Sequence, residues 1–290
     1  MLRDCPICDA HDGRFLKNYT KHHLARCRRC GMVYAGKRPT PAELAEFYAT
    51  YPLHAQLNPI TRARYLELLT DLAPARTHGR ILDAGCGVGF FLDTAREAGW
   101  DTHGSEYDER VVKTCRDRGI TMWQGALTTE SFPDAYFDVI TSFEVMEHLQ
   151  DPLAELRNFH RMLRPGGVLY ITTPNFSALS RRLIGQNWSV VNYPEHLNYF
   201  TPATLRRALE SAGLSVTACR TTGISVSRLS YRVDSSDQRE ANHTPMNTDQ
   251  RLRARIEGNG LLRVGKSSLN ALLGMLSAGD TIKMFGARPQ

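Results

Sequence analysis

Four cysteines near the amino terminus have a spacing that suits a metal ion. They form two Cys-x2-Cys pairs, Cys5 with Cys8 and Cys27 with Cys30, and eighteen residues separate the pairs. Two such pairs can arrange four thiolates tetrahedrally around one Zn2+, which closes the site and gives it a structural role. The stretch is short and polar, so bound metal would stabilise its fold. The sequence therefore predicts a zinc ribbon over residues 1–38 that holds one structural Zn2+ through these cysteines.

A glycine-rich loop suggests a ligand site. The segment Ala84-Gly85-Cys86-Gly87-Val88-Gly89 directly follows a predicted strand and precedes a predicted helix. Glycines let the backbone turn sharply and approach a ligand, at the edge of the sheet where open α/β folds bind ligands. The spacing is D-x-G-x-G-x-G, counted from Asp83. It is not the dinucleotide fingerprint G-x-G-x-x-G, because Phe90 occupies the position of that motif's third glycine.

One carboxylate has the position of a ribose ligand. Glu106 ends the second predicted strand, 21 residues after Gly85. A carboxylate at this place can accept hydrogen bonds from both hydroxyls of a ribose. The alternative, a solvated turn residue, fits its position less well.

Two Glu-His pairs could supply a general base. Glu147-His148 follows the fourth predicted strand, and Glu195-His196 lies within Asn192–Phe200. A histidine changes its protonation near neutral pH and can take a proton from a nucleophile. The competing interpretation of each is a hydrogen-bonded structural histidine. We favour His196 as the base, since its segment is rich in tyrosine and asparagine and leaves the sheet where a substrate should bind.

The elements that would position these residues alternate between short apolar runs and amphipathic helices, a pattern typical of a parallel sheet with crossover helices. We expect strands at 80–84, 101–105, 120–124, 137–142, 167–172 and 215–220, and a seventh strand at 280–285 added antiparallel at the edge. We expect helices at 40–48, 59–73, 90–98, 108–118, 145–148, 152–163, 202–213 and 269–276.

Composition and charge narrow the class of protein. The 290 residues are 42% hydrophobic and 23% charged, which excludes a wholly disordered chain and a small disulfide scaffold. The sequence shows neither a membrane-length apolar run nor a signal peptide, so we expect a cytoplasmic protein. The first forty residues carry nine basic and three acidic side chains, and this excess equals the net charge of +6. The basic patch suggests an anionic partner, or else a solubilising surface.

Three motifs in order resemble class I S-adenosylmethionine-dependent methyltransferases. The first is the glycine loop with Glu106, and the second, Phe137–His148, resembles the fourth strand of these enzymes and its adjoining loop. The third, Leu163–Asn175, resembles the turn into their fifth strand. The resemblance covers about residues 75–220. It implies a Rossmann-like α/β fold, with a seven-stranded sheet that is parallel except for one antiparallel edge strand, flanked by helices, in addition to the ribbon.

The resemblance also implies a division of the chain. Residues 1–38 would form the ribbon and 39–74 a helical linker. Residues 75–290 would form the methyltransferase domain, with an insertion near 230–262. The residues that would bind S-adenosylmethionine are Asp83, Gly85, Cys86, Gly87, Gly89, Glu106, Tyr107, Ala126, Phe143 and Glu144. Many relatives carry an acidic residue after the third strand to meet the adenine amino group, and this chain has Gly125-Ala126-Leu127 there. That contact would come from the backbone or from elsewhere.

The same resemblance also suggests which kind of molecule accepts the methyl group. The ribbon and the Pro-Glu-His-Leu segment resemble bacterial methyltransferases of small-molecule and carbohydrate pathways, and the core resembles quinone-pathway O-methyltransferases, which lack the ribbon. We predict transfer to a hydroxyl of a small molecule that is anionic or sugar-like: a glycan, a nucleotide-linked sugar or a natural product. His196, assisted by Glu195, would act as the base, and His148 would act in its place or line the cofactor pocket.

Three other functions stay open. An RNA base methyltransferase would use the basic ribbon to hold a phosphate backbone, although the ribbon shows little aromatic interleaving and the chain lacks an Asn-Pro-Pro-Tyr motif. A catalytically silent binding module would lack cofactor binding. An NAD-binding domain would need the dinucleotide spacing that the loop does not have.

Overall fold

The computed structural model describes residues 2–40, 42–43, 56–223 and 273–290. The chain divides into two compact units. The ribbon unit comprises residues 1–54, 174–204 and 220–282, and the sheet unit comprises residues 55–173, 205–219 and 283–290. No helix within the described ranges is long and apolar enough to cross a membrane.

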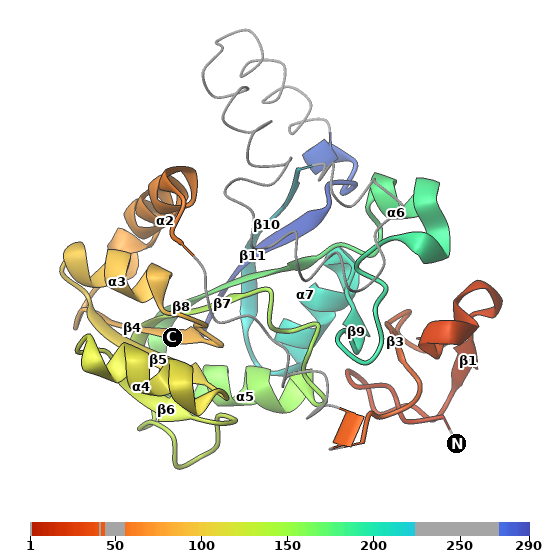
Figure 1. Cartoon of the computed structure of the whole chain (residues 1–290), viewed down its shortest axis with the longest axis horizontal. Helices are drawn as coiled ribbons and strands as arrows, with labels where there is room; N and C mark the ends of the chain where they lie inside the picture. Colours follow the sequence, from red (N-terminus) through yellow and green to blue (C-terminus); the bar gives the residue numbers. More distant parts are fainter. Residues whose placement is uncertain (1, 41, 44–55, 224–272) are drawn as a thin grey trace, which may run out of the picture. The chain divides into compact units, whose positions relative to one another are not determined.

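A seven-stranded sheet has the order β10-β11-β8-β7-β4-β5-β6 (Figure 1). Pairing is parallel between β4 and β5, β4 and β7, β5 and β6, and β7 and β8. The strands are β4 (Arg80–Ala84), β5 (Asp101–Glu106), β6 (Thr121–Gln124), β7 (Phe137–Phe143), β8 (Leu163–Pro174), β10 (Ser215–Thr222) and β11 (Thr281–Ala287).

One strand of this sheet runs against the others. Arg288, just after β11, donates its N–H to Gly167 O at 3.0 Å and accepts from Gly166 N at 2.9 Å, so the end of β11 lies beside the start of β8. β11 is therefore antiparallel, and β10 lies outside it. The predicted fold class is confirmed.

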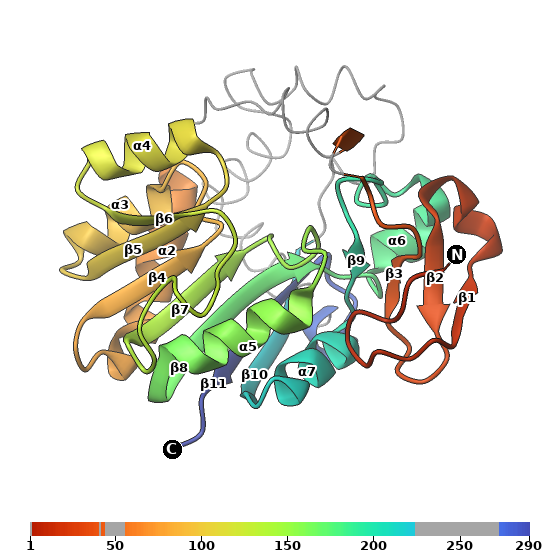
Figure 2. The same ribbon diagram turned by 90° about the horizontal axis from the view of Figure 1, so that it is seen from below.

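Helices cover both faces of the sheet. Figure 2 shows α5 (Pro152–Met162) and α7 (Pro202–Ser211) on one face, while α2 (Pro59–Leu72) packs against α3 (Phe90–Glu97) on the other. A further helix, α4 (Glu109–Asp117), lies against β5 and β6. Short polar side chains cap three of these helices: Asn58, Asp108 and Asp151 each accept a hydrogen bond from a first-turn amide.

One predicted helix is wrong. Residues 145–148 form a turn, closed by a single bond from His148 N to Val145 O at 2.9 Å. Glu144 has a left-handed φ of 54°, and α5 already begins at Pro152. The four residues 145–148 alone cannot offset the cost of nucleating a helix. The predictions for residues 44–48, 230–262 and 269–272 lie outside the described residues.

The ribbon unit contains a second sheet, antiparallel throughout, with the order β1-β2-β3-β9. Its strands are β1 (Gly13–Phe15), β2 (Leu24–Cys27), β3 (Val33–Ala35) and β9 (Asn198–Tyr199). The last of these comes from the segment that contains the second Glu-His pair. The 3-10 turns η1 (Lys17–His22) and η3 (Gly185–Asn187) and the short helix α6 (Leu179–Ile184) also belong to this unit.

The apolar core of the ribbon unit contains residues from the amino-terminal segment and from residues 176–199. Its buried members are Tyr19, Leu24, Val33, Phe176, Ala178, Trp188, Val190, Val191 and Tyr199. The amino-terminal residues thus share one apolar core with residues 176–199. The predicted domain boundaries at residues 38 and 74 stay predictions.

Candidate active site and metal centre

The glycine loop joins β4 to α3 in a tight turn. Gly85, Gly87 and Gly89 all have left-handed φ values, of 72°, 49° and 78°. A Cβ at Gly85 would lie 2.5 Å from a methyl carbon of Val145, whereas a Cβ at Gly87 would meet no atom within 4 Å. Gly85 therefore serves packing, and the backbone at Gly87 faces open space that a ligand can approach.

Glu106 lies beside this loop, at the end of β5. Its Oε2 accepts the N–H of Gly87 at 3.0 Å, and its Oε1 accepts the N–H of Tyr107 at 2.6 Å. A carboxylate has about four acceptor positions, so two remain for hydroxyl groups. The Tyr107 side chain is 66% exposed. The structure thus brings together Glu106 and the loop as the sequence predicted.

Asp83 is buried at the end of β4. It is 2% exposed, and Oδ1 accepts a hydrogen bond from Thr141 Oγ1 at 2.8 Å. Burial raises the pKa of this carboxyl to about 8, and the charge of Glu106 acts in the same direction, although the Thr141 hydrogen bond opposes them. The carboxyl is therefore largely protonated near neutral pH, and it would ionise readily beside a cation.

An aromatic cluster contains another predicted site residue. The Phe143 ring, at the end of β7, lies 4.9 Å from that of Phe91 and 5.8 Å from that of Tyr65, centroid to centroid. Tyr65 comes from α2, which the sequence did not associate with the site. Glu144 follows with its N–H bonded to Thr172 O at 2.9 Å.

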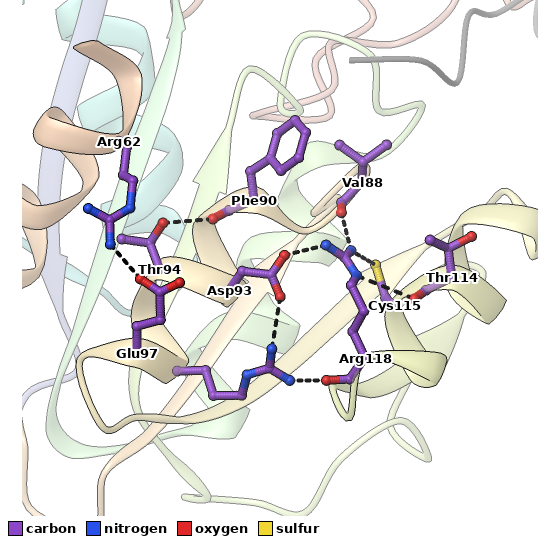
Figure 3. A network of polar contacts seen from close by, with 10 residues as sticks. Arg62, Val88, Phe90, Asp93, Thr94, Glu97, Thr114, Cys115 and Arg118 are labelled. Carbon is purple, nitrogen blue, oxygen red and sulfur yellow. Dashed lines mark hydrogen bonds and ion pairs between the residues drawn. The ribbon is translucent and has the colours of Figure 1, made fainter. Parts of the chain in front are cut away.

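A network of polar contacts that the sequence did not reveal anchors the loop to α4 (Figure 3). Arg118 donates to the carbonyl of Val88 and to the carboxylate of Asp93, and its Nη2 lies 3.3 Å from Cys115 Sγ. The thiol of Cys86, together with Arg118, lowers the pKa of Cys115 to about 7. Cys86 and Cys115 approach Gly87 O at 3.5 and 3.8 Å. Two cysteines that look isolated in sequence thus meet beneath the loop.

The loop after β6 is held by side chains that donate to its carbonyl oxygens. Trp123 Nε1 donates to Ala126 O at 2.9 Å, and Asn158 Nδ2 donates to Leu127 O at 2.8 Å. One turn before Asn158, burial raises the pKa of Glu155 to about 7, despite a hydrogen bond from Asn158. In sequence Glu155 is an ordinary polar residue of a helix, so no signal pointed to it.

The first Glu-His pair lies in the turn after β7. Glu147 is only 1% exposed and accepts from Thr173 Oγ1 at 2.9 Å. His148 Nε2 lies 4.0 Å from Glu147 Oε1. The histidine thus lies near a buried carboxylate, at a separation longer than a hydrogen bond.

The second pair lies in the ribbon unit, before β9. His196 Nδ1 lies 2.6 Å from the carbonyl oxygen of Val190, which only a ring N–H can satisfy. In the neutral ring, Nε2 is then the proton acceptor. The Glu195 carboxylate accepts a hydrogen bond from Asn192 Nδ2 at 2.6 Å.

The four amino-terminal cysteines come together. Their sulfurs all lie within 4.8 Å of one another, with Cys5 and Cys30 3.4 Å apart and Cys8 and Cys27 3.6 Å apart. A tetrahedral Zn2+ with bonds of about 2.3 Å separates its sulfur ligands by about 3.8 Å. Hydrogen bonding from Cys5 lowers the pKa of Cys30 to about 5, which favours a thiolate at that sulfur, whereas the Cys30 contact raises the pKa of Cys5 and burial raises that of Cys8. The geometry and the donor set fit zinc.

Comparison with known proteins identifies the family. A methyltransferase-domain family model matches residues 57–218. The ubiquinone biosynthesis O-methyltransferase of Aeromonas salmonicida is 32% identical over 179 residues, covering 57% of this chain and 73% of that protein. A probable S-adenosylmethionine-dependent methyltransferase of Mycolicibacterium smegmatis is 35% identical over 144 residues, covering 49% of this chain and 54% of that protein.

The fold agrees with this family. The crystal structure of an S-adenosylmethionine-dependent methyltransferase from Archaeoglobus fulgidus has a TM-score of 0.52 at 20% identity, covering 79% of this chain and 93% of that one. The chain belongs to the methyltransferase-domain family and is a class I S-adenosylmethionine-dependent methyltransferase.

The buried carboxyl of Asp83 gives a prediction on pH. Its pKa is about 8 in the folded protein against an ordinary value of 3.8, so the folded state binds this proton more tightly. The contribution of Asp83 to stability is therefore lost as the pH rises from about 4 to 8. In the ligand-free protein, Asp83→Asn should raise the free energy of unfolding by about 1–3 kcal/mol at pH 8 and by much less at pH 5. Urea unfolding at both pH values checks this. Exposed Glu130→Gln is the control, and an equal effect of Asp83→Asn at both pH values would contradict the burial argument.

Proposed function

We propose that the enzyme transfers a methyl group from S-adenosylmethionine to a hydroxyl of a small molecule: a glycan, a nucleotide-linked sugar or a natural product. The observation that carries this proposal is the His196 ring, whose Nδ1–H bonds to Val190 O and whose Nε2 is thereby the proton acceptor. The O-methyltransferase name of the Aeromonas relative supports an oxygen acceptor.

The cofactor would lie along the loop. Glu106 would receive both ribose hydroxyls with its two remaining acceptor positions, and the backbone at Gly85 and Gly87 would meet the methionine end, supported by Asp83. Tyr107, Ala126 and Phe143 are proposed on the adenine side.

When bound, S-adenosylmethionine supplies an electrophilic methyl group on a sulfonium. Since the displacement is in line, the protein mainly has to position the acceptor oxygen and take its proton. As the new O–C bond formed and the S–C bond to the methyl group broke, leaving a neutral thioether, His196 Nε2 would take the hydroxyl proton.

We also propose that Cys5, Cys8, Cys27 and Cys30 hold one structural Zn2+. The four sulfurs would complete its coordination, so the metal would have no open position for substrate. The ribbon would then support the fold of its unit and take no part in bond making.

The cofactor assignment predicts the effect of two substitutions. Glu106→Ala should weaken binding of S-adenosylmethionine by about 10- to 150-fold, because charged hydrogen bonds to the ribose are lost. Gly87→Leu should also weaken it, by filling the space that the loop leaves open. Gly185→Leu is the matched control, since Gly185 also combines a left-handed φ with open space. Calorimetric titration measures all three. If the two glycine variants lose affinity equally, general backbone strain explains the loss.

Screening acceptors with methyl-labelled S-adenosylmethionine tests the proposed function. We expect label in a small hydroxyl compound, in an ether that resists mild base. Label in RNA would favour the alternative of an RNA base methyltransferase. Three of the basic side chains in the ribbon are already engaged: Arg3 with backbone carbonyls, Arg28 with Asp12, and Lys37 with Glu43. The ribbon therefore offers fewer cations to a phosphate backbone than its sequence suggests.

A further inference from the structure

The ribbon extends directly into the segment that carries His196. Strand β3 pairs with β9 in the register Val33 to Tyr199 and Tyr34 to Asn198. One residue further, Ala35 N donates to Leu197 O at 2.9 Å. The ladder thus reaches the residue next to His196.

The Arg3 side chain forms hydrogen bonds to both segments at this junction. Its Nε donates to Ala35 O at 2.7 Å, and its Nη2 donates to Leu197 O at 3.1 Å and to Asn198 Oδ1 at 3.4 Å. Its own carbonyl accepts from Tyr34 Oη at 3.2 Å. A planar guanidinium can hold several acceptors in fixed directions, which a lysine ammonium cannot do.

Two further contacts around His196 belong to the ribbon unit. Val190, whose carbonyl fixes the ring, is a core residue together with Leu24 and Val33 of the ribbon strands. Tyr199 Oη donates to the carbonyl of His196 at 3.0 Å, and the Tyr199 ring is part of this core. Ribbon residues therefore support both the loop before His196 and the strand after it.

We propose that the ribbon positions the general base, with Arg3 as the positioning residue that ties the amino-terminal strands to the His196 segment. This inference rests on the proposed role of His196. A general base acts only within hydrogen-bond reach of its proton, and an error of about 1 Å can cost about 100-fold in rate. Arg3 has no chemical role of its own and acts only through the placement of the histidine ring.

Arg3→Met tests the proposal in the full-length, zinc-loaded protein. We expect kcat to fall about 10- to 100-fold, with the KM for S-adenosylmethionine and its calorimetric Kd within about 2-fold of wild type, since Arg3 and the cofactor loop belong to different units. Arg3→Lys keeps the positive charge but loses the planar guanidinium. Its kcat should lie between those of the wild type and Arg3→Met. Arg14→Met, an exposed arginine on β1, is the matched control and should keep full activity.

A double variant separates positioning from a general loss of fold. If Arg3 acts through His196, Arg3→Met should reduce kcat no further in a His196→Ala background. If the double variant instead loses kcat by the product of the two single effects, the proposal is overturned. Metal analysis should give one Zn2+ per chain in each variant. If Arg3→Met loses its Zn2+, the kcat of Arg3→Lys alone tests the positioning role. Full activity of His196→Ala would sink the proposed base itself. Normal turnover of Arg3→Met and Arg3→Lys beside an inactive His196→Ala would refute only the positioning role.

Discussion

His196→Ala is expected to lower turnover by about 10^2- to 10^4-fold, the usual contribution of a general base, with little change in cofactor affinity. The reason is the placement of the ring: the Val190 carbonyl fixes the tautomer, so that Nε2 is the nitrogen that takes a proton. His196→Gln should fail similarly, since an amide does not accept a proton near neutral pH. Steady-state kinetics on the true acceptor, paired with calorimetry, provides the measurement.

His148→Ala is the matched comparison. Because His148 lies beside the buried Glu147 after β7, in the sheet unit with the cofactor loop, a role in the cofactor pocket would lower affinity along with rate. Full activity of His196→Ala would move the base to His148, or show that the acceptor arrives already ionised.

Cys27→Ser is expected to remove the Zn2+ and unfold the ribbon. Metal binding of this kind contributes about 10–16 kcal/mol of apparent free energy in small zinc domains, far more than the short strands β1 to β3 could supply. Because the ribbon shares its core with residues 176–199, the loss should also expose Trp188, which is only 1% exposed in the folded unit. Elemental analysis and tryptophan fluorescence would report the two effects.

Cys219→Ser, outside the cluster, should leave both measurements unchanged. His22→Ala should do the same, since the four thiolates would already complete the coordination sphere. A Cys27→Ser protein with one Zn2+ per chain and normal fluorescence would show that the cluster is not a structural zinc site.

Local patterns in the sequence were enough to predict the sheet and the loop. β4 begins and ends where its apolar run does, at Arg80 and Ala84, and Glu106 meets the loop as its position at the end of β5 implies. Parallel strands leave a continuous apolar signal, and the order of strands brings their carboxyl ends together.

The rest depended on contacts that leave no periodic signal. β9 has only two residues and pairs with a strand far away in sequence, so neither its existence nor its partner was visible. Arg118 looks like a surface residue after α4, but its side chain reaches back to Val88 O. The prediction of a helix at 145–148 was wrong because the left-handed φ of Glu144 turns the backbone out of a helical path.

Calorimetric titration of the purified protein with S-adenosylmethionine, its demethylated product and NAD tests the central claim most directly. We expect one cofactor site per chain for S-adenosylmethionine and its product, lost or strongly weakened in Glu106→Ala, and no binding of NAD. Tight binding of NAD without any binding of S-adenosylmethionine or its product would contradict it.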